Sequence, residues 1–110
     1  MKYLCLVYLE PDKFTAVPDR ECFNCADDLT KQGLLLAAEP LFQADTAKTV
    51  RVRNGRVAVT DGPFAETKET LAGFYLIDAA NHDEALKIAA KIPPARAGSI
   101  EVRPVRELQP

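Results

Sequence analysis

The sequence predicts an α+β fold in which two helices cover one face of an antiparallel sheet. Two runs of residues, 2–9 and 71–79, are apolar at both alternating sets of positions, which is typical of central strands. Segments with helical periodicity follow each of these strands. The Asn54-Gly55 pair adds a two-residue hairpin. A chain of 110 residues, 47% hydrophobic and 27% charged, forms one domain, 1–110.

The first half of the chain predicts a strand, a helix and a second strand. Pro18 suits the first turn of a helix that runs to about Gln32, and Gly33 suits its end. The next strand covers residues 34–41. The apolar positions of the helix fall on one face and comprise Cys22, Cys25, Ala26 and Leu29.

Residues 49–60 form the predicted hairpin, because Asn and Gly tolerate the positive φ that its turn requires. The turn places Val52 opposite Val57 and Val50 opposite Val59, so one face of the hairpin is apolar. The other face holds Arg51, Arg53, Arg56 and Ala58.

The second half predicts strand 71–79, a helix and a last strand over 99–105. Asn81 caps the helix, with Glu84 as its capping-box partner, and the helix ends at Pro93-Pro94. Pro104 favours an edge position for the last strand. The apolar face of the helix is expected to contain Ala85, Leu86, Ala89 and Ile92.

This order of elements is that of a ferredoxin-like split β-α-β sandwich with an inserted β-hairpin. Both helices cover one sheet face, and the apolar second face predicts a homodimer packed sheet to sheet. The topology brings loops 61–70 and 93–99 to the same end of the sheet, beside Glu10. We therefore expect a cleft between these two loops.

Residues 59–69, Val-Thr-Asp-Gly-Pro-Phe-Ala-Glu-Thr-Lys-Glu, resemble the signature of the DGPF-domain branch of the YCII-related proteins. Residues 73–77, 83–86 and 94–105 resemble the same family. The resemblance implies a dimeric α/β-barrel of ferredoxin-like subunits with a small-molecule cleft. It also implies a setting beside extracytoplasmic-function sigma factors, and hence a possible accessory role in such a regulatory system.

Two carboxylates are the candidate catalytic groups. Asp61 acts as a general acid or base if it is desolvated, and Glu66 is a second candidate for proton transfer. The structural alternatives are that Asp61 caps the Asp-Gly-Pro turn and that Glu66 belongs to a solvated acidic loop.

Three further residues are candidates for ligand binding. Phe64 lines a pocket wall or, alternatively, anchors the loop in the core. Thr67 adds a hydroxyl to the same site. Arg96 clamps a carboxylate or phosphate or, alternatively, pairs with Asp61 or Glu66 and holds the two loops together.

Cys22 and Cys25 have the C-x-x-C spacing of redox or zinc sites. No second pair or histidine cluster accompanies them, so buried free thiols are the favoured interpretation, and we expect no metal and no cofactor. His82, the only histidine, is expected on the surface at a helix N-terminus.

The net charge of −2 disfavours nucleic-acid binding, and no apolar run is long enough to span a membrane. Three cysteines without a disulfide pattern favour the cytoplasm. Two functions remain open: a dimeric small-molecule-binding protein without turnover, and a cofactorless lyase or isomerase that uses Asp61 or Glu66. Whether the protein is an enzyme is thus undecided from the sequence.

Overall fold

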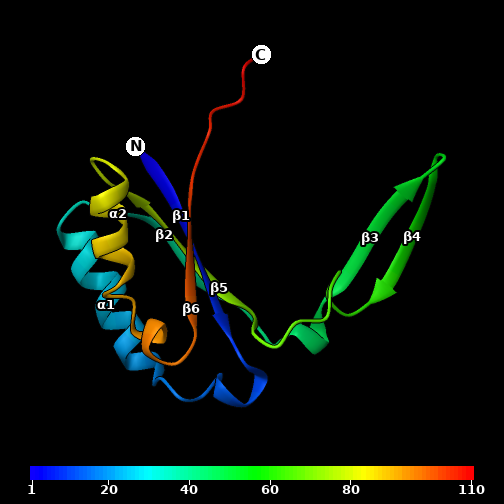
Figure 1. Cartoon of the computed structure of the whole chain (residues 1–110), viewed down its shortest axis with the longest axis horizontal. Coiled ribbons are helices and arrows are strands. Elements are labelled where there is room, and N and C mark those ends of the chain that lie inside the picture. The colour runs from blue at the N-terminus through cyan, green and yellow to red at the C-terminus, as the bar shows by residue number, and fades with distance from the viewer.

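A computed structural model, which describes all 110 residues, shows an antiparallel sheet with two helices on one face (Figure 1). The ferredoxin-like α+β prediction is confirmed. The strand order is β2-β5-β1-β6, so the two strands that are apolar on both faces are the central ones. The strands are β1 (Lys2–Leu9), β2 (Leu35–Pro40), β5 (Thr70–Asp78) and β6 (Ser99–Pro104).

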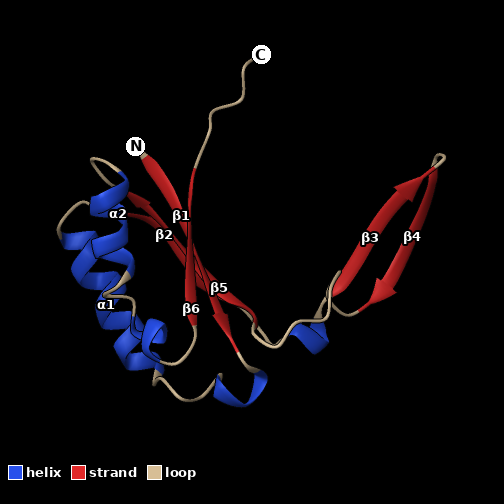
Figure 2. Ribbon diagram, in the orientation of Figure 1, coloured by secondary structure: helices blue, strands red, loops and turns tan.

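The helices α1 (Asp19–Lys31) and α2 (His82–Ala89) lie side by side on the same face of the sheet (Figure 2). Pro18 precedes α1, and Gly33 follows it with a φ of 74°, the left-handed conformation that glycine adopts readily. Three short 3₁₀ helices complete the connections: η1 (Pro11–Lys13), η2 (Ala44–Thr46) and η3 (Pro93–Arg96). Neither α-helix is long and apolar enough to cross a membrane.

The start of α2 matches the prediction, and its apolar face needs one correction. The backbone N–H of Glu84 donates to the side-chain oxygen of Asn81 over 3.0 Å. The helix ends at Ala89, before the two prolines, and Leu86 is nearly half exposed. Ile88 is buried in its place, because it completes the i, i+3, i+4, i+7 spacing on which Ala85 and Ile92 also lie.

The core lies between the sheet and the helices. Alternate residues of β1 and β5 point into it, and their side chains are almost completely buried. Helix side chains close the layer from the other side. The core comprises Tyr3, Cys5, Val7, Leu9, Tyr75, Ile77, Leu29, Ala79, Ala85, Ile88, Ala89 and Ile92.

The opposite face of the sheet, called here the open face, carries the other alternating set. Its apolar side chains form cross-strand pairs in register, and no helix of the chain packs over them (Figure 2). The pairs across β1 and β5 are Leu4 with Leu76, Leu6 with Phe74, and Tyr8 with Leu71.

The predicted hairpin forms a separate two-stranded sheet of β3 (Lys48–Arg53) and β4 (Arg56–Asp61). Asn54 and Gly55 have φ values of 52° and 74°, and the predicted register is confirmed. Residues 48–61, called here the arm, project away from the four-stranded sheet (Figure 1). As a result, all four valines of the apolar face are more than half exposed: Val50, Val52, Val57 and Val59.

Candidate functional site

A cavity of about 670 Å³ lies where the arm joins the four-stranded sheet. Its wall combines four parts of the chain. They are Tyr8 of β1, the segment 41–49 except Asp45, the loop residues Pro63, Phe64, Ala65 and Thr67, and the start of β5 at Thr70 and Leu71. This volume falls within the range of about 300–1,000 Å³ that is usual for small-molecule sites. We call it the elbow cavity.

Exposed aromatic side chains stand at the elbow cavity. Phe64 is 81% exposed and Phe42 is 87% exposed, although both line the cavity. The alternative in which Phe64 anchors its loop in the core is therefore wrong, since the loop leaves the sheet to reach the arm. Large exposed aromatic side chains are typical of binding surfaces.

Threonine hydroxyls provide much of the polar chemistry of the elbow cavity. Each donates its proton to a backbone carbonyl oxygen: Thr49 to Gly62 over 2.8 Å, and Thr67 to Glu69 over 2.6 Å. Thr46 and Thr70 do the same at 2.7 and 3.2 Å. A hydroxyl whose proton is already used retains only acceptor capacity. Most of the remaining lining surface is apolar.

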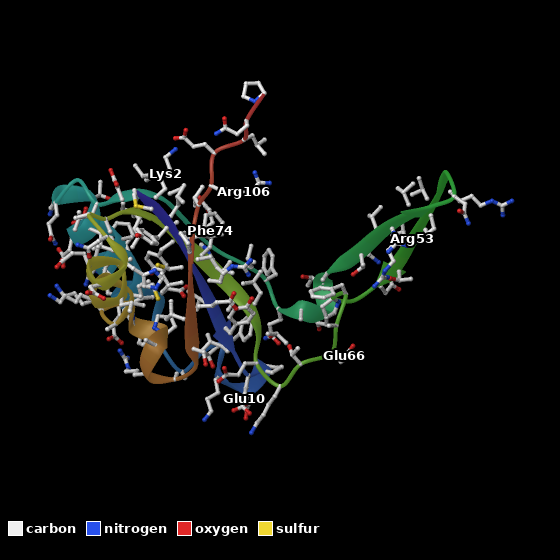
Figure 3. The ribbon with its side chains drawn as sticks, turned by 45° about the horizontal axis from the view of Figure 1, so that its top comes forward. Lys2, Glu10, Arg53, Glu66, Phe74 and Arg106 are labelled. Carbon is white, nitrogen blue, oxygen red and sulfur yellow. The ribbon has the colours of Figure 1, made fainter.

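Asp61 lies at the base of the arm, where its carboxylate accepts a hydrogen bond from the ammonium group of Lys48 across the hairpin. This ion pair, rather than a capped turn, is the role that the structure gives to Asp61. Its side chain is 88% exposed, so nothing desolvates the carboxylate. Glu66 is also exposed and lies on the connection between the arm and β5 (Figure 3).

Arg96 belongs to another part of the molecule. Its guanidinium donates two hydrogen bonds to the carboxylate of Glu21 on α1, at 3.0 and 2.7 Å. The hydrogen bond from Arg96 holds the pKa of Glu21 below its ordinary value of 4.5. Arg96 thus ties η3 to α1, on the side of the sheet away from the arm (Figure 1). The structure does not bring it to Asp61 or Glu66.

A side-chain hydrogen bond joins the two predicted loops, and an ion pair joins one of them to the end of β1. The hydroxyl of Ser99 donates to the carboxylate of Glu69 over 2.6 Å, and Lys68 lies 3.5 Å from the carboxylate of Glu10. The prediction that loops 61–70 and 93–99 lie at the same end of the sheet is therefore correct. The elbow cavity instead extends from loop 63–67 toward the arm, so only Phe64 and Thr67 of the candidate residues line it.

Several residues of the elbow cavity were missed by the sequence reasoning. The sequence places Tyr8 and Leu41 only in strands and Thr49 only in the hairpin, and it assigns residues 42–48 to no element. One signal was available: Leu41 and Phe42 follow Pro40 at the end of a strand, and large apolar residues in a connection have no core position of their own. The sequence does not identify Lys48 as a lining residue, because the neighbours of Lys48 depend on the direction in which the arm projects.

The cysteines form a partly buried cluster with Tyr75 rather than a reactive site. Cys22 and Cys25 are free thiols on α1, and burial raises the pKa of both above the ordinary value. Burial also raises the pKa of Tyr75. Since the thiolate is the reactive form, these raised pKa values argue against nucleophilic or redox chemistry at this pair.

His82 contributes to packing at the start of α2. Its ring lies edge-to-face against the ring of Tyr3, with 5.7 Å between the ring centroids. The only histidine thus packs on the helix-covered face of the sheet and does not line the elbow cavity.

Comparison with known proteins gives two matches. The profile of the YCII-related domain matches residues 1–109. An uncharacterised protein of Rhizobium meliloti (strain 1021), R00369, is 50% identical over 119 aligned positions, which cover 100% of this chain and 96% of that protein. Both matches extend over the sheet, the helices and the arm.

Proposed function

The chain belongs to the YCII-related family, and we propose that it is a cytoplasmic, homodimeric protein that binds a small molecule in the elbow cavity. The observation that carries this proposal is the cavity itself: a largely apolar volume of about 670 Å³ assembled from four separate segments. Sites of this size and lining are typical of small-molecule pockets. Three free cysteines support the cytoplasmic setting.

The lining indicates the chemistry of the ligand. Four threonine hydroxyls offer acceptor lone pairs, because their protons are bound to backbone carbonyls. The cation of Lys48 is engaged with Asp61. A flat, apolar ligand that carries an N–H or O–H donor therefore fits this lining better than an anion or a ligand with acceptors alone.

In this proposal Phe64 and Thr67 contact the ligand. Phe64 supplies an aromatic surface for a flat body, and Thr67 an acceptor for its donor group. Asp61 is engaged with Lys48 and Glu66 is exposed, and neither lines the cavity, so neither contacts the ligand in this proposal. Arg96 holds η3 against α1 and does not touch the ligand.

The homodimer is supported by the open face. Leu4, Leu6, Phe74 and Leu76 form a contiguous apolar surface on which no element of the same chain packs. Such a surface on a small domain is typical of an interface. The open face also reaches the elbow cavity through Tyr8 and Leu71.

The test uses a matched pair of probes, indole and 1-methylindole, which differ only in the N–H donor. At a concentration ten times its Kd, indole should raise the melting temperature by about 5 °C, because binding to the native state alone adds about 1.4 kcal/mol. The shift from 1-methylindole should be clearly smaller.

Two substitutions test whether indole binds in the elbow cavity. Phe64→Ala should abolish the indole shift, whereas Phe23→Ala should retain it, because Phe23 is also an exposed phenylalanine but lies on α1 outside the cavity. Equal shifts in both variants, or no shift from either probe in the wild type, would refute the proposal. Consumption of a bound metabolite that is lost in Asp61→Asn would identify an enzyme instead.

A further inference from the structure

The single chain is not compact. Its radius of gyration is 15.6 Å and its principal extents are 46 × 42 × 19 Å. A compact domain of 110 residues has a radius of gyration of about 13 Å. The difference comes from the arm and from the C-terminal residues after β6, both of which extend away from the four-stranded sheet (Figure 1).

The exposed surface is correspondingly large. The chain exposes 7910 Å², whereas a compact monomer of 12.1 kDa exposes about 6,000 Å². The excess is thus about 1,900 Å² per chain, and covering it in a pair of chains would bury about 3,800 Å² in total. That area lies within the range of obligate homodimers, about 2,000–5,000 Å².

Two apolar surfaces of the chain are available for burial in such a pair. One is the open face, with Leu6 and Phe74 at its centre. The other is the arm's valine stripe, formed by Val50, Val52, Val57 and Val59, which are all on one side of the hairpin. The elbow cavity connects them, since Tyr8 of the open face and Lys48 at the base of the stripe both line it.

Charge favours a second copy as the molecule that covers these surfaces. The arm holds four basic and one acidic side chains, a net charge of +3, whereas the other residues hold ten basic and fifteen acidic ones, a net charge of −5. Glu39 lies at one rim of the open face, opposite Phe74. Glu101 lies at the other rim, opposite Leu6, and is ion-paired there with Arg103 over 3.1 Å. The arm of one copy is therefore attracted to the body of another.

The width of the arm allows it to lie on the open face of a second copy. Two paired strands are about 10 Å wide and four are about 19 Å wide, so an arm covers about half of an open face. The other half remains for contact between the two sheets. Because a two-fold interface uses the same surfaces on both copies, each arm would cover the other's sheet.

We propose that two copies exchange arms, so that the valine stripe of each lies along the open face of the other and the partner closes the elbow cavity. The exchange itself rests on the shape, the area and the charges. Closure of the elbow cavity by the partner rests on the proposed ligand site. It explains why Phe42 and Phe64 are so exposed in a single chain.

The test compares two neighbouring positions on β4 that face opposite sides of the arm. Val57→Glu places a charge in the stripe, and Ala58→Glu places the same charge on the arginine side. Both residues are exposed in the single chain, so neither change disturbs its core. Sedimentation equilibrium should show a wild-type dimer, a dimer Kd raised at least about 100-fold in Val57→Glu, and little change in Ala58→Glu.

A second measurement needs no variant. In a dimer mixed from ¹³C-labelled and unlabelled chains, isotope-filtered NOEs should connect the methyl groups of Val52 and Val57 to Leu6 and Phe74 of the other copy. A monomeric wild type at micromolar concentration, a dimer that Val57→Glu does not weaken, or a dimer without these NOEs would overturn the exchange.

Indole calorimetry separates the two proposals. Loss of indole binding in monomeric Val57→Glu, with retention in Ala58→Glu, supports closure of the cavity by the partner. Wild-type affinity in monomeric Val57→Glu contradicts closure. If the wild-type dimer binds no indole, the ligand proposal fails, whereas the exchange of arms is still decided by sedimentation and NOEs.

Discussion

Alkaline pH should destabilise the protein through the thiol of Cys5, which is the most deeply buried titratable group of the core. Its exposed fraction is 0%, and burial raises its pKa from 9.0 to about 11. A group with a raised pKa in the folded state holds its proton more tightly there than in the unfolded chain. Its stabilising effect is complete below pH 9 and is lost as the pH rises toward 11.

The size of the effect follows from the two pKa values. Between pH 8 and pH 10 the unfolded thiol ionises while the folded one stays protonated, which lowers the free energy of unfolding by about 1.4 kcal/mol. With a urea m-value of about 1.5 kcal/mol/M, the unfolding midpoint falls by about 1 M. Burial also raises the pKa of Cys22 and Cys25, so these thiols add a loss of the same sign.

The variant Cys5→Ala isolates the contribution of Cys5. It should be less stable than the wild type near neutral pH, by about 1 kcal/mol, because a buried sulfur is removed. That difference should shrink, and then reverse, as the pH approaches 10. Urea unfolding of both proteins at equal concentration, at pH 8, 9 and 10, measures it. A difference that does not change with pH would refute the argument that burial of this thiol governs its ionisation.

Two further substitutions test local geometry. Gly98→Ala should unfold the chain or cost more than about 4 kcal/mol, because an added Cβ would lie 2.0 Å from the carbonyl oxygen of Tyr8. Gly33→Ala is the control, because its added Cβ would meet nothing within 4 Å. Its cost should stay near the roughly 1–2 kcal/mol that a side chain at a positive φ costs. Equal losses of stability for the two variants in thermal melts would contradict the steric argument. Asn81→Ala should cost about 1 kcal/mol, because it removes the cap on the N–H of Glu84; an unchanged melting temperature would show that water replaces the cap.

The elements of the fold were predictable where local chemistry determines the structure. The turn at Asn54-Gly55 depends on φ alone, and it determines the register of β3 and β4. The cap at Asn81 involves residues three positions apart. The two-sided apolar pattern of β1 and β5 correctly predicted that both are central strands.

The candidate site was predicted less well, because its residues are placed by long-range contacts. Arg96 pairs with a carboxylate 75 positions earlier, on a helix whose rotation no local pattern defines. The direction of the arm is equally hidden, since alternation of Val and Arg is the same whether a hairpin lies on its own sheet or leaves it. Thus Phe64 and Thr67 line the elbow cavity, whereas Asp61 pairs with Lys48 and Arg96 pairs with Glu21.

The strands of the arm pair only with each other, and this gives the arm a use as an internal reporter. An isolated two-stranded hairpin is marginally stable in water, so its amide protons should exchange rapidly when nothing covers it. Amides of β1 and β5 exchange only when the core opens. The ratio of the two exchange rates within one sample therefore measures how much of the time the arm is covered, whatever molecule covers it.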